Sequence, residues 1–228
     1  MGQIELFPLY LSFKVSFLAT LLSLALGVPL AWFLARKSWL GRDWLDALFT
    51  LPMVLPPTVL GYYLLLAIGR RSMIGTFLEE RFGLTLVFTW PAAVLASALV
   101  SVPLLIKAAR AAFEGVDPNL EDAARTLGKG EASIFFTITL PLAWRGIAAG
   151  TVLAWARALG DFGATLMVAG NIPGQTQTMP IAIYDAVQAG RLSLANTLVL
   201  IITLLALVTL WALNQLNRDI LGRGHSRD

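Results

Sequence analysis

Two charged residues within a long apolar stretch are the first candidates for chemistry in this chain. Arg157 and Asp161 are four positions apart, so a continuous helix would place them on one face. Charges surrounded by apolar groups are costly unless they are paired or hydrated. We therefore expect one of two arrangements. Either the two residues form an ion pair that neutralises itself between helices, or Arg157 is partly free to attract an anion and the pair exchanges partners between states.

The motifs of common catalytic sites are missing from the sequence. It has no cysteine and one histidine, His225 in a basic tail, which argues against a disulfide, a thiolate nucleophile or a metal–histidine cluster. Neither His-Glu-x-x-His nor Gly-x-Ser-x-Gly occurs, and Arg157 with Asp161 lacks a partner base. An integral-membrane protease or phosphatase would need such a constellation. We expect a non-catalytic chain that binds no cofactor and no metal.

The phosphate-binding loop of ATPases is absent as well. The pattern Gly-x-x-x-x-Gly-Lys-Ser/Thr requires glycine five positions before its Gly-Lys pair and serine or threonine directly after it. Around the pair Gly128-Lys129, these two positions hold Ala123 and Gly130. The sequence therefore predicts that this chain does not hydrolyse ATP itself, and that any ATP-driven activity depends on a partner.

A polar island at 114–141 interrupts the apolar runs. Pro118 suits the first position of a helix, Asp117 can cap that helix, and Gly128 supplies a stop. Acidic residues in its first turns complement the positive end of the helix dipole; they are Glu121 and Asp122. One face at helical spacing carries small and apolar side chains that a partner could approach closely: Leu120, Ala123, Ala124 and Leu127. We predict that this island seats against another protein.

Composition places the chain in a membrane. Hydrophobic residues make up 57% of it, charged residues 14%, and the mean hydropathy is +0.73. Five segments are long and apolar enough to cross a hydrocarbon layer of about 30 Å; they are about 8–35, 44–69, 86–108, 142–169 and 194–217. The stretch 178–190 is shorter and more polar, and we expect it near the outer surface. The sequence predicts an all-α polytopic protein whose termini lie on opposite sides.

Charge in the short loops selects the orientation, because Lys and Arg are retained on the cytoplasmic side. Placing the first loop inside gives eleven inner basic residues against four outer ones. The inner residues are Arg36, Lys37, Arg42, Lys107, Arg110, Arg125, Lys129, Arg145, Arg218, Arg223 and Arg227. This predicts an outer N-terminus, a cytoplasmic C-terminus and a cytoplasmic 114–141 island. The same pattern explains the pI near 9.5 without a nucleic-acid partner.

The second apolar segment contains three prolines within six residues, Pro52, Pro56 and Pro57. Prolines remove backbone donors and bend a helix, which is tolerated only where protein or water satisfies the freed carbonyls. The bend is either a packing kink or the wall of a conduit, in which the Thr58 hydroxyl would be available to a passing oxyanion.

The island also carries a family resemblance. The order Asp122-Ala123-Ala124, three residues, Gly128, nine residues, Ile138-x-Leu140-Pro141 resembles the Glu-Ala-Ala loop by which permease subunits of bacterial ABC importers grip their ATPases. Asp122 stands where the family usually has Glu, and Glu121 is its neighbour. The resemblance implies that the residues coupling the chain to an ATPase are Glu121, Asp122, Ala123, Ala124, Gly128, Ile138, Leu140 and Pro141.

The segment 157–165, Arg-Ala-Leu-Gly-Asp-Phe-Gly-Ala-Thr, narrows the resemblance to the molybdate-type permeases. Further segments over nearly the whole chain agree, among them 51–57 and 171–174. The resemblance implies one transmembrane permease domain over 1–228 with the type I ABC importer fold, and the ATPase-docking loop 114–141 within it. The implied pathway residues are Pro56, Pro57, Thr58, Arg157, Gly160 and Asp161.

The same resemblance implies partners and a substrate. We expect a permease homodimer in the bacterial inner membrane, two cytoplasmic ATPase subunits that bind ATP and Mg²⁺, and a periplasmic molybdate-binding protein. The expected substrate is molybdate or tungstate. The alternative is a permease for sulfate, thiosulfate or another tetrahedral oxyanion, which would share the docking loop.

Overall fold

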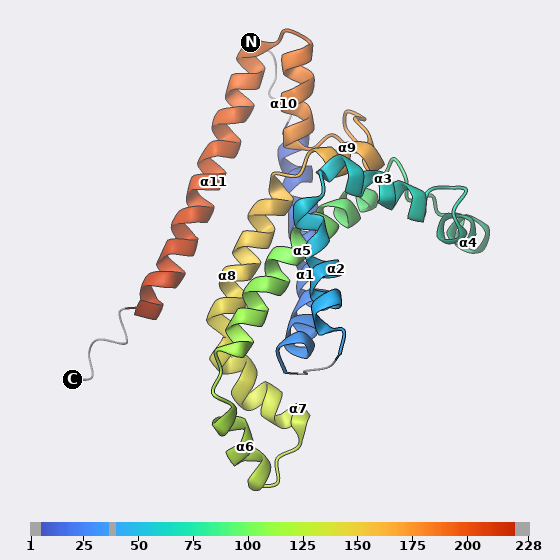
Figure 1. Cartoon of the computed structure of the whole chain (residues 1–228). Helices are drawn as coiled ribbons and strands as arrows, with labels where there is room; N and C mark the ends of the chain where they lie inside the picture. Colours follow the sequence, from blue (N-terminus) through green and yellow to red (C-terminus); the bar gives the residue numbers. More distant parts are fainter. Residues whose placement is uncertain (1–5, 37–39, 222–228) are drawn as a thin grey trace.

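The fold is built from helices (Figure 1), and the computed structural model describes residues 6–36 and 40–221, with no strand in those ranges. Lys37, His225 and the basic residues Arg223 and Arg227, all used in the sequence analysis, lie outside the described residues. The elements are α1 (Phe7–Arg36), α2 (Arg42–Val54), α3 (Pro57–Ile68), α4 (Met73–Phe82), α5 (Trp90–Glu114), α6 (Pro118–Thr126), α7 (Glu131–Ile134), the π-helical turn η1 (Phe135–Thr139), α8 (Leu140–Leu159), α9 (Gly163–Ala169), α10 (Met179–Gln188) and α11 (Leu192–Leu221).

Four stretches of the described chain are helical, long and apolar enough to cross a membrane: α1, α5, the continuous run Glu131–Leu159, and α11 as far as Trp211. A fifth span forms if α2 and α3 are counted together, although the two helices meet at an angle of 114°. The predicted all-α protein with about five spans is therefore confirmed, with one of the five sharply broken.

The break between α2 and α3 follows from consecutive prolines. A residue before proline is disfavoured in the helical region, and this applies both to Leu55, before Pro56, and to Pro56, before Pro57. Their ψ angles are 141° and 137°, both extended. Pro57 then begins α3, where its missing N–H is harmless. The sequence predicted a bend here, and the structure resolves it as two separate helices.

The predicted fourth span, 142–169, has the wrong limits. The helix begins earlier, at Glu131, passes through η1, and ends at Leu159, and α9 is a separate short helix. Asp161 lies in the break, where its Oδ2 accepts hydrogen bonds from the Thr165 backbone N–H (3.1 Å) and hydroxyl (2.6 Å). These bonds fix the first turn of α9. The expectation that Arg157 and Asp161 share one face of a continuous helix was therefore also wrong.

The core lies where α1, α5 and α8 pack side by side. Near the end of the molecule that holds α6, Leu34, Ile106 and Phe113 are fully buried in one cluster. Along the same stretch, α5 and α8 approach closely because α8 carries glycine at the contact. A Cβ on Gly150 would lie 2.7 Å from the Ala108 Cβ, and one on Gly146 would lie 2.5 Å from the Ala112 Cβ. These small residues of α8 thus serve helix packing.

We expect Gly150→Ala to destabilise the bundle by about 1–3 kcal/mol, because the added methyl group must push α5 away from α8. Gly130→Ala is the matched control, since a Cβ at Gly130 meets nothing within 4 Å. Thermal unfolding in detergent, followed by loss of the monodisperse peak on size-exclusion chromatography, measures both. Equal midpoints for the two variants would show that the α5–α8 contact is looser than its geometry indicates.

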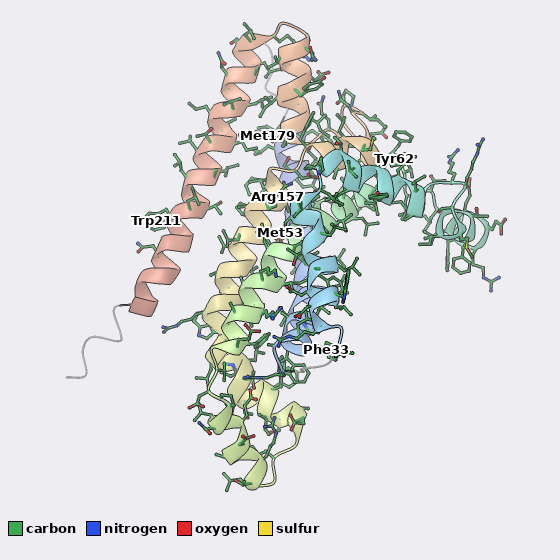
Figure 2. All side chains as sticks on the ribbon, viewed as in Figure 1. Phe33, Met53, Tyr62, Arg157, Met179 and Trp211 are labelled. Carbon is green, nitrogen blue, oxygen red and sulfur yellow. The ribbon has the colours of Figure 1, made fainter. Side chains whose placement is uncertain are left out.

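Large apolar side chains are exposed on α2, α3 and α11, and Met53, Tyr62 and Trp211 mark these helices in Figure 2. Trp211 is 64% exposed, and none of the described α2 side chains is buried. The helix α11 packs mainly on α10 and α8 and leaves the rest of its surface open. In water such faces would be unfavourable, whereas lipid or another apolar helix can cover them.

Candidate functional site

The helix α6 has the local signals that the sequence predicted. The Asp117 side chain accepts a hydrogen bond from the Asn119 backbone N–H at 2.9 Å and so caps the first turn. At the other end, Gly128 has a φ angle of +79°, and the Lys129 N–H reaches back to the Ala124 carbonyl at 3.1 Å. Both the predicted cap and the predicted glycine stop are confirmed.

One face of α6 is apolar and uncovered. Leu120 is 47% exposed, Leu127 is 81% exposed, and Ala123 lies exposed between them. Ala124, predicted for the same face, is instead buried. Figure 1 shows α6 at one extremity of the molecule, beyond the ends of the long helices, so this apolar strip is open to a partner.

The second half of the predicted loop is helical. Ile138 lies in η1, and Leu140 and Pro141 begin α8, so these three residues belong to the long run Glu131–Leu159. Ile138 and Leu140 are half-buried, and Pro141 is exposed. Pro141 follows the π-helical turn directly inside this continuous run, so the proline coincides with the irregular part of the helix. Of the predicted loop 114–141, the part outside the long helices is the segment around α6, between α5 and the run Glu131–Leu159.

Glu121 and Asp122, adjacent in sequence, have opposite surroundings. Asp122 is exposed and accepts from Arg125 Nη1 at 2.6 Å. Glu121 is 4% exposed and bonds to Arg36 and Thr139, both through Oε1 at 2.6 Å. Arg125 also holds Glu131 at 2.6 Å. The hydrogen bonds to Glu131 and Asp122 raise the pKa of Arg125 above its ordinary value, so the Arg125 guanidinium stays charged.

The two broken spans meet each other inside the bundle. A Cβ on Gly163, at the start of α9, would lie 3.1 Å from the Thr58 Cγ2 and 3.3 Å from the Pro57 Cβ. A Cβ on Gly61 of α3 would lie 2.7 Å from the Met167 Cβ and 2.9 Å from the Ala164 carbonyl oxygen. The structure therefore brings the proline bend against the break that follows α8, although about a hundred residues separate them in sequence.

The predicted pathway residues divide by exposure around this junction. Pro56, Thr58 and Gly160 are exposed, and Pro57 is half-buried. The Asp161 side chain is fully buried, whereas Arg157, in the last turn of α8 (Figure 2), keeps 32% of its side-chain surface exposed. Arg157 Nη1 lies 3.9 Å from Asp161 Oδ1, longer than the 2.7–2.9 Å typical of a charge-assisted hydrogen bond. The pair is therefore loose, and its arginine is accessible.

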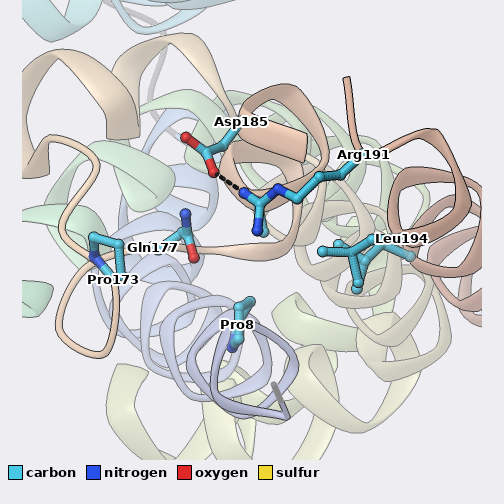
Figure 3. A pocket seen from close by; sticks show the side chains of 8 residues that line it. Pro8, Pro173, Gln177, Asp185, Arg191 and Leu194 are labelled. Atoms are coloured by element: carbon cyan, nitrogen blue, oxygen red, sulfur yellow. Dashed lines mark hydrogen bonds and ion pairs between the residues drawn. The ribbon is translucent and has the colours of Figure 1, made fainter. Parts of the chain in front are cut away.

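A third feature lies at the opposite end of the molecule from α6. A pocket of about 220 Å³ opens between the start of α1 and the α10–α11 hairpin, with Pro8 and Pro173 in its wall (Figure 3). Arg191 and Asp185 form an ion pair of 2.7 Å at its edge. The predicted outer stretch 178–190 is largely α10, which is too short to cross a membrane.

The sequence profile described as "Binding-protein-dependent transport system inner membrane component" matches residues 27–222. The chain belongs to this family. It is 50% identical over 218 residues to the "Molybdenum transport system permease protein ModB" of Escherichia coli (strain K12), covering 93% of this chain and 95% of that protein. It is 43% identical over 229 residues to the protein of the same name from Haemophilus influenzae, covering 98% and 100%.

Comparison with solved structures identifies the fold of this inner membrane component. A chain from the "Crystal structure of a bacterial ABC transporter involved in the import of the acidic polysaccharide alginate" superposes with a TM-score of 0.76 at 16% identity, covering 96% of this chain and 81% of that one. At that identity the likeness concerns the fold alone. It confirms the predicted type I ABC importer permease fold.

Sequence reasoning missed several residues that organise this permease. Arg36 was counted only as a basic residue of the first loop, and Thr139 was an unassigned position between Ile138 and Leu140. Gly61 and Gly163 carry the α3–α9 contact, and neither was assigned a role in it. Glycine within a predicted span was the available signal for the last two, since a residue without a side chain permits close backbone approach.

Proposed function

We propose that this chain is the permease subunit of an ABC importer that moves molybdate or tungstate across the bacterial inner membrane, driven by a separate ATPase. The observation that carries the proposal is the 50% identity to the Escherichia coli molybdenum permease across nearly the full length of both chains. The 157–165 segment, noted above for its resemblance to molybdate-type permeases, forms the end of α8 and the start of α9.

The end of the molecule that holds α6 faces the cytoplasm. Its basic residues support this orientation, because Arg and Lys concentrate on the inner side of short loops. Those within the described residues are Arg36, Arg42, Lys107, Arg110, Arg125, Lys129 and Arg145. With five spans, the N-terminal end lies outside and the C-terminal end inside.

The apolar strip of α6, made of Leu120, Ala123 and Leu127, docks an ATPase subunit. Small and apolar exposed side chains on a capped helix suit insertion into a complementary groove. ATP and Mg²⁺ bind to that subunit, and this chain carries no catalytic residue. A second copy of the permease covers part of the exposed apolar surface of α2, α3 and α11, and two ATPases serve the dimer. A periplasmic binding protein delivers the oxyanion at the end that holds α10.

The conduit runs past the junction of α3 and α9. Thr58, exposed on α3, offers a hydroxyl to an oxyanion, and the accessible Arg157 offers a weak electrostatic attraction. Asp161 beneath it offsets part of that charge, which keeps the site from holding a divalent anion too long, since conduction requires that bound ions also leave. Movement of α6 with the ATPases rocks the spans between outward and inward openings.

The deciding experiment is ATP-dependent uptake of labelled molybdate into proteoliposomes that contain this chain, its ATPase and the binding protein. We expect uptake that persists in excess sulfate and is competed by tungstate. Equal competition by sulfate would move the assignment to a broader tetrahedral-oxyanion permease. An assembled complex that hydrolyses ATP but accumulates none of these anions would overturn the proposal.

A further inference from the structure

We propose that Glu121 is a positioning residue that ties the docking helix α6 to the end of α1 and to η1, so that movement of α6 passes directly into two membrane spans. This inference rests on the proposed function, because it assigns the route by which an ATPase would move the pathway. It separates Glu121 from the residues that face the ATPase, among which the sequence resemblance had placed it.

The contacts of Glu121 join three elements at a single carboxylate oxygen. Oε1 accepts from Arg36 Nη2 at 2.6 Å and from Thr139 Oγ1 at 2.6 Å. Arg36 is the last residue of α1, and Thr139 is the last residue of η1. The carboxylate therefore links the C-terminal end of α1 with the helical run that continues into α8.

Burial makes this link stronger than a surface ion pair. The side chains of Glu121 and Arg36 are 5% and 19% exposed, and Thr139 is fully buried. Removing one partner from a buried pair leaves the other charge without compensation, which is more disruptive than losing an exposed pair. By contrast, the Arg125 bonds to Asp122 and Glu131 lie on exposed side chains, and Arg125 reaches the other Glu121 oxygen, Oε2, only at 3.8 Å.

A direct charge pair joins α6 to the end of α1. The helix α6 packs chiefly on α7 and η1. A cavity of about 330 Å³ lies beside this contact, and its lining includes Arg36 and Glu121 together with Trp32 and Phe135. The ion pair between Arg36 and Glu121 is therefore a direct polar connection between the two helices.

The position of Glu121 on α6 keeps it away from the docking strip. Leu120, Ala123 and Leu127 are exposed, whereas Glu121 and Ala124 turn into the protein. One side of a helix of nine residues thus meets the partner and the other side holds the bundle. Loss of the Glu121 carboxylate should therefore uncouple the docking strip from the bundle without releasing the ATPase subunit.

The test uses the assembled permease–ATPase complex with Glu121→Gln, which keeps the side-chain shape and removes the charge. We expect wild-type recovery of the ATPase subunit and continued ATP hydrolysis, with molybdate accumulated per ATP reduced about tenfold because the half-buried Arg36 loses its charged partner. Thr139→Val, which removes one of the two bonds to Oε1, should give a smaller loss. Glu80→Gln, an exposed change on α4, is the control and should match wild type.

A double-variant cycle separates a shared link from two independent roles. Arg36→Gln and Glu121→Gln combined should be no worse than either alone, because each removes the same connection. Losses that multiply in the double variant would overturn the proposal. So would loss of the ATPase subunit in Glu121→Gln, or wild-type uptake per ATP.

A distance measurement keeps the inference testable if the transport assignment fails. The chain has no cysteine, so spin labels at Ala35→Cys on α1 and Asn119→Cys on α6 mark only these two positions in each permease copy, and the distance within one copy is followed. We expect the same distance with and without ATP in the wild-type complex, and a broadened, nucleotide-dependent distribution in Glu121→Gln. A wild-type distance that changes with ATP as much as the variant's would overturn the link, whichever anion is transported.

Discussion

Replacing Gly61 with valine is expected to reduce ATP-driven uptake by more than about tenfold while the protein still inserts into the membrane. The first side-chain carbon would lie 2.7 Å from the Met167 Cβ and 2.9 Å from the Ala164 carbonyl oxygen. Neither atom is the end of a flexible side chain, so α3 must move away from α9. Overpacking of this kind typically costs about 1–3 kcal/mol and shifts the backbone, and a displacement of about 1 Å can cost a hundredfold in rate at a functional site.

The matched control for Gly61 is Ala67→Val, which adds a β-branched side chain to an exposed position of the same helix. It should transport like the wild type. Uptake is measured in proteoliposomes with protein amounts equalised, and size-exclusion chromatography checks that both variants are monodisperse. Normal uptake by Gly61→Val would show that the α3–α9 contact is dispensable for the pathway.

Gly128→Val is expected to lower recovery of the ATPase subunit about tenfold. Gly128 has a φ angle of +79° and meets nothing within 4 Å of an added Cβ, so the change is penalised by backbone conformation and not by collision. A left-handed conformation costs about 1–2 kcal/mol for a residue with a Cβ, and about 1.4 kcal/mol is a factor of ten in population. The Lys129 bond back to Ala124 would be lost, and with it the end of α6 that presents Leu127.

Gly128→Asn tests the conformational reason directly, because asparagine adopts the left-handed region far more readily than valine. We expect Asn to retain most of the ATPase subunit in a pull-down from detergent-solubilised membranes. If Asn and Val lost the subunit equally, the ATPase would need a glycine surface at this position. If neither lost it, the docking site would lie elsewhere on the cytoplasmic face.

The amino-acid sequence by itself determined the features that act within a few residues. Asp117 caps α6 and Gly128 ends it because each satisfies backbone groups of its own helix. The double proline at 56–57 breaks the second span because proline restricts its immediate neighbour. The spans were visible because a hydrocarbon layer demands about 20 apolar residues in sequence. The all-α class and about five crossings follow from these local rules.

The tertiary structure alone decided which distant residues meet. The 142–169 prediction failed because the run is mostly apolar on both sides of the break, and the break depends on Asp161 accepting hydrogen bonds from the first turn of α9 inside a buried site. The motif around Glu121 predicted that this residue faces the ATPase. Its side chain instead bonds to Arg36, 85 positions away. Burial and pairing of a charge depend on where whole helices pack against one another, and no pattern within one helix encodes that arrangement.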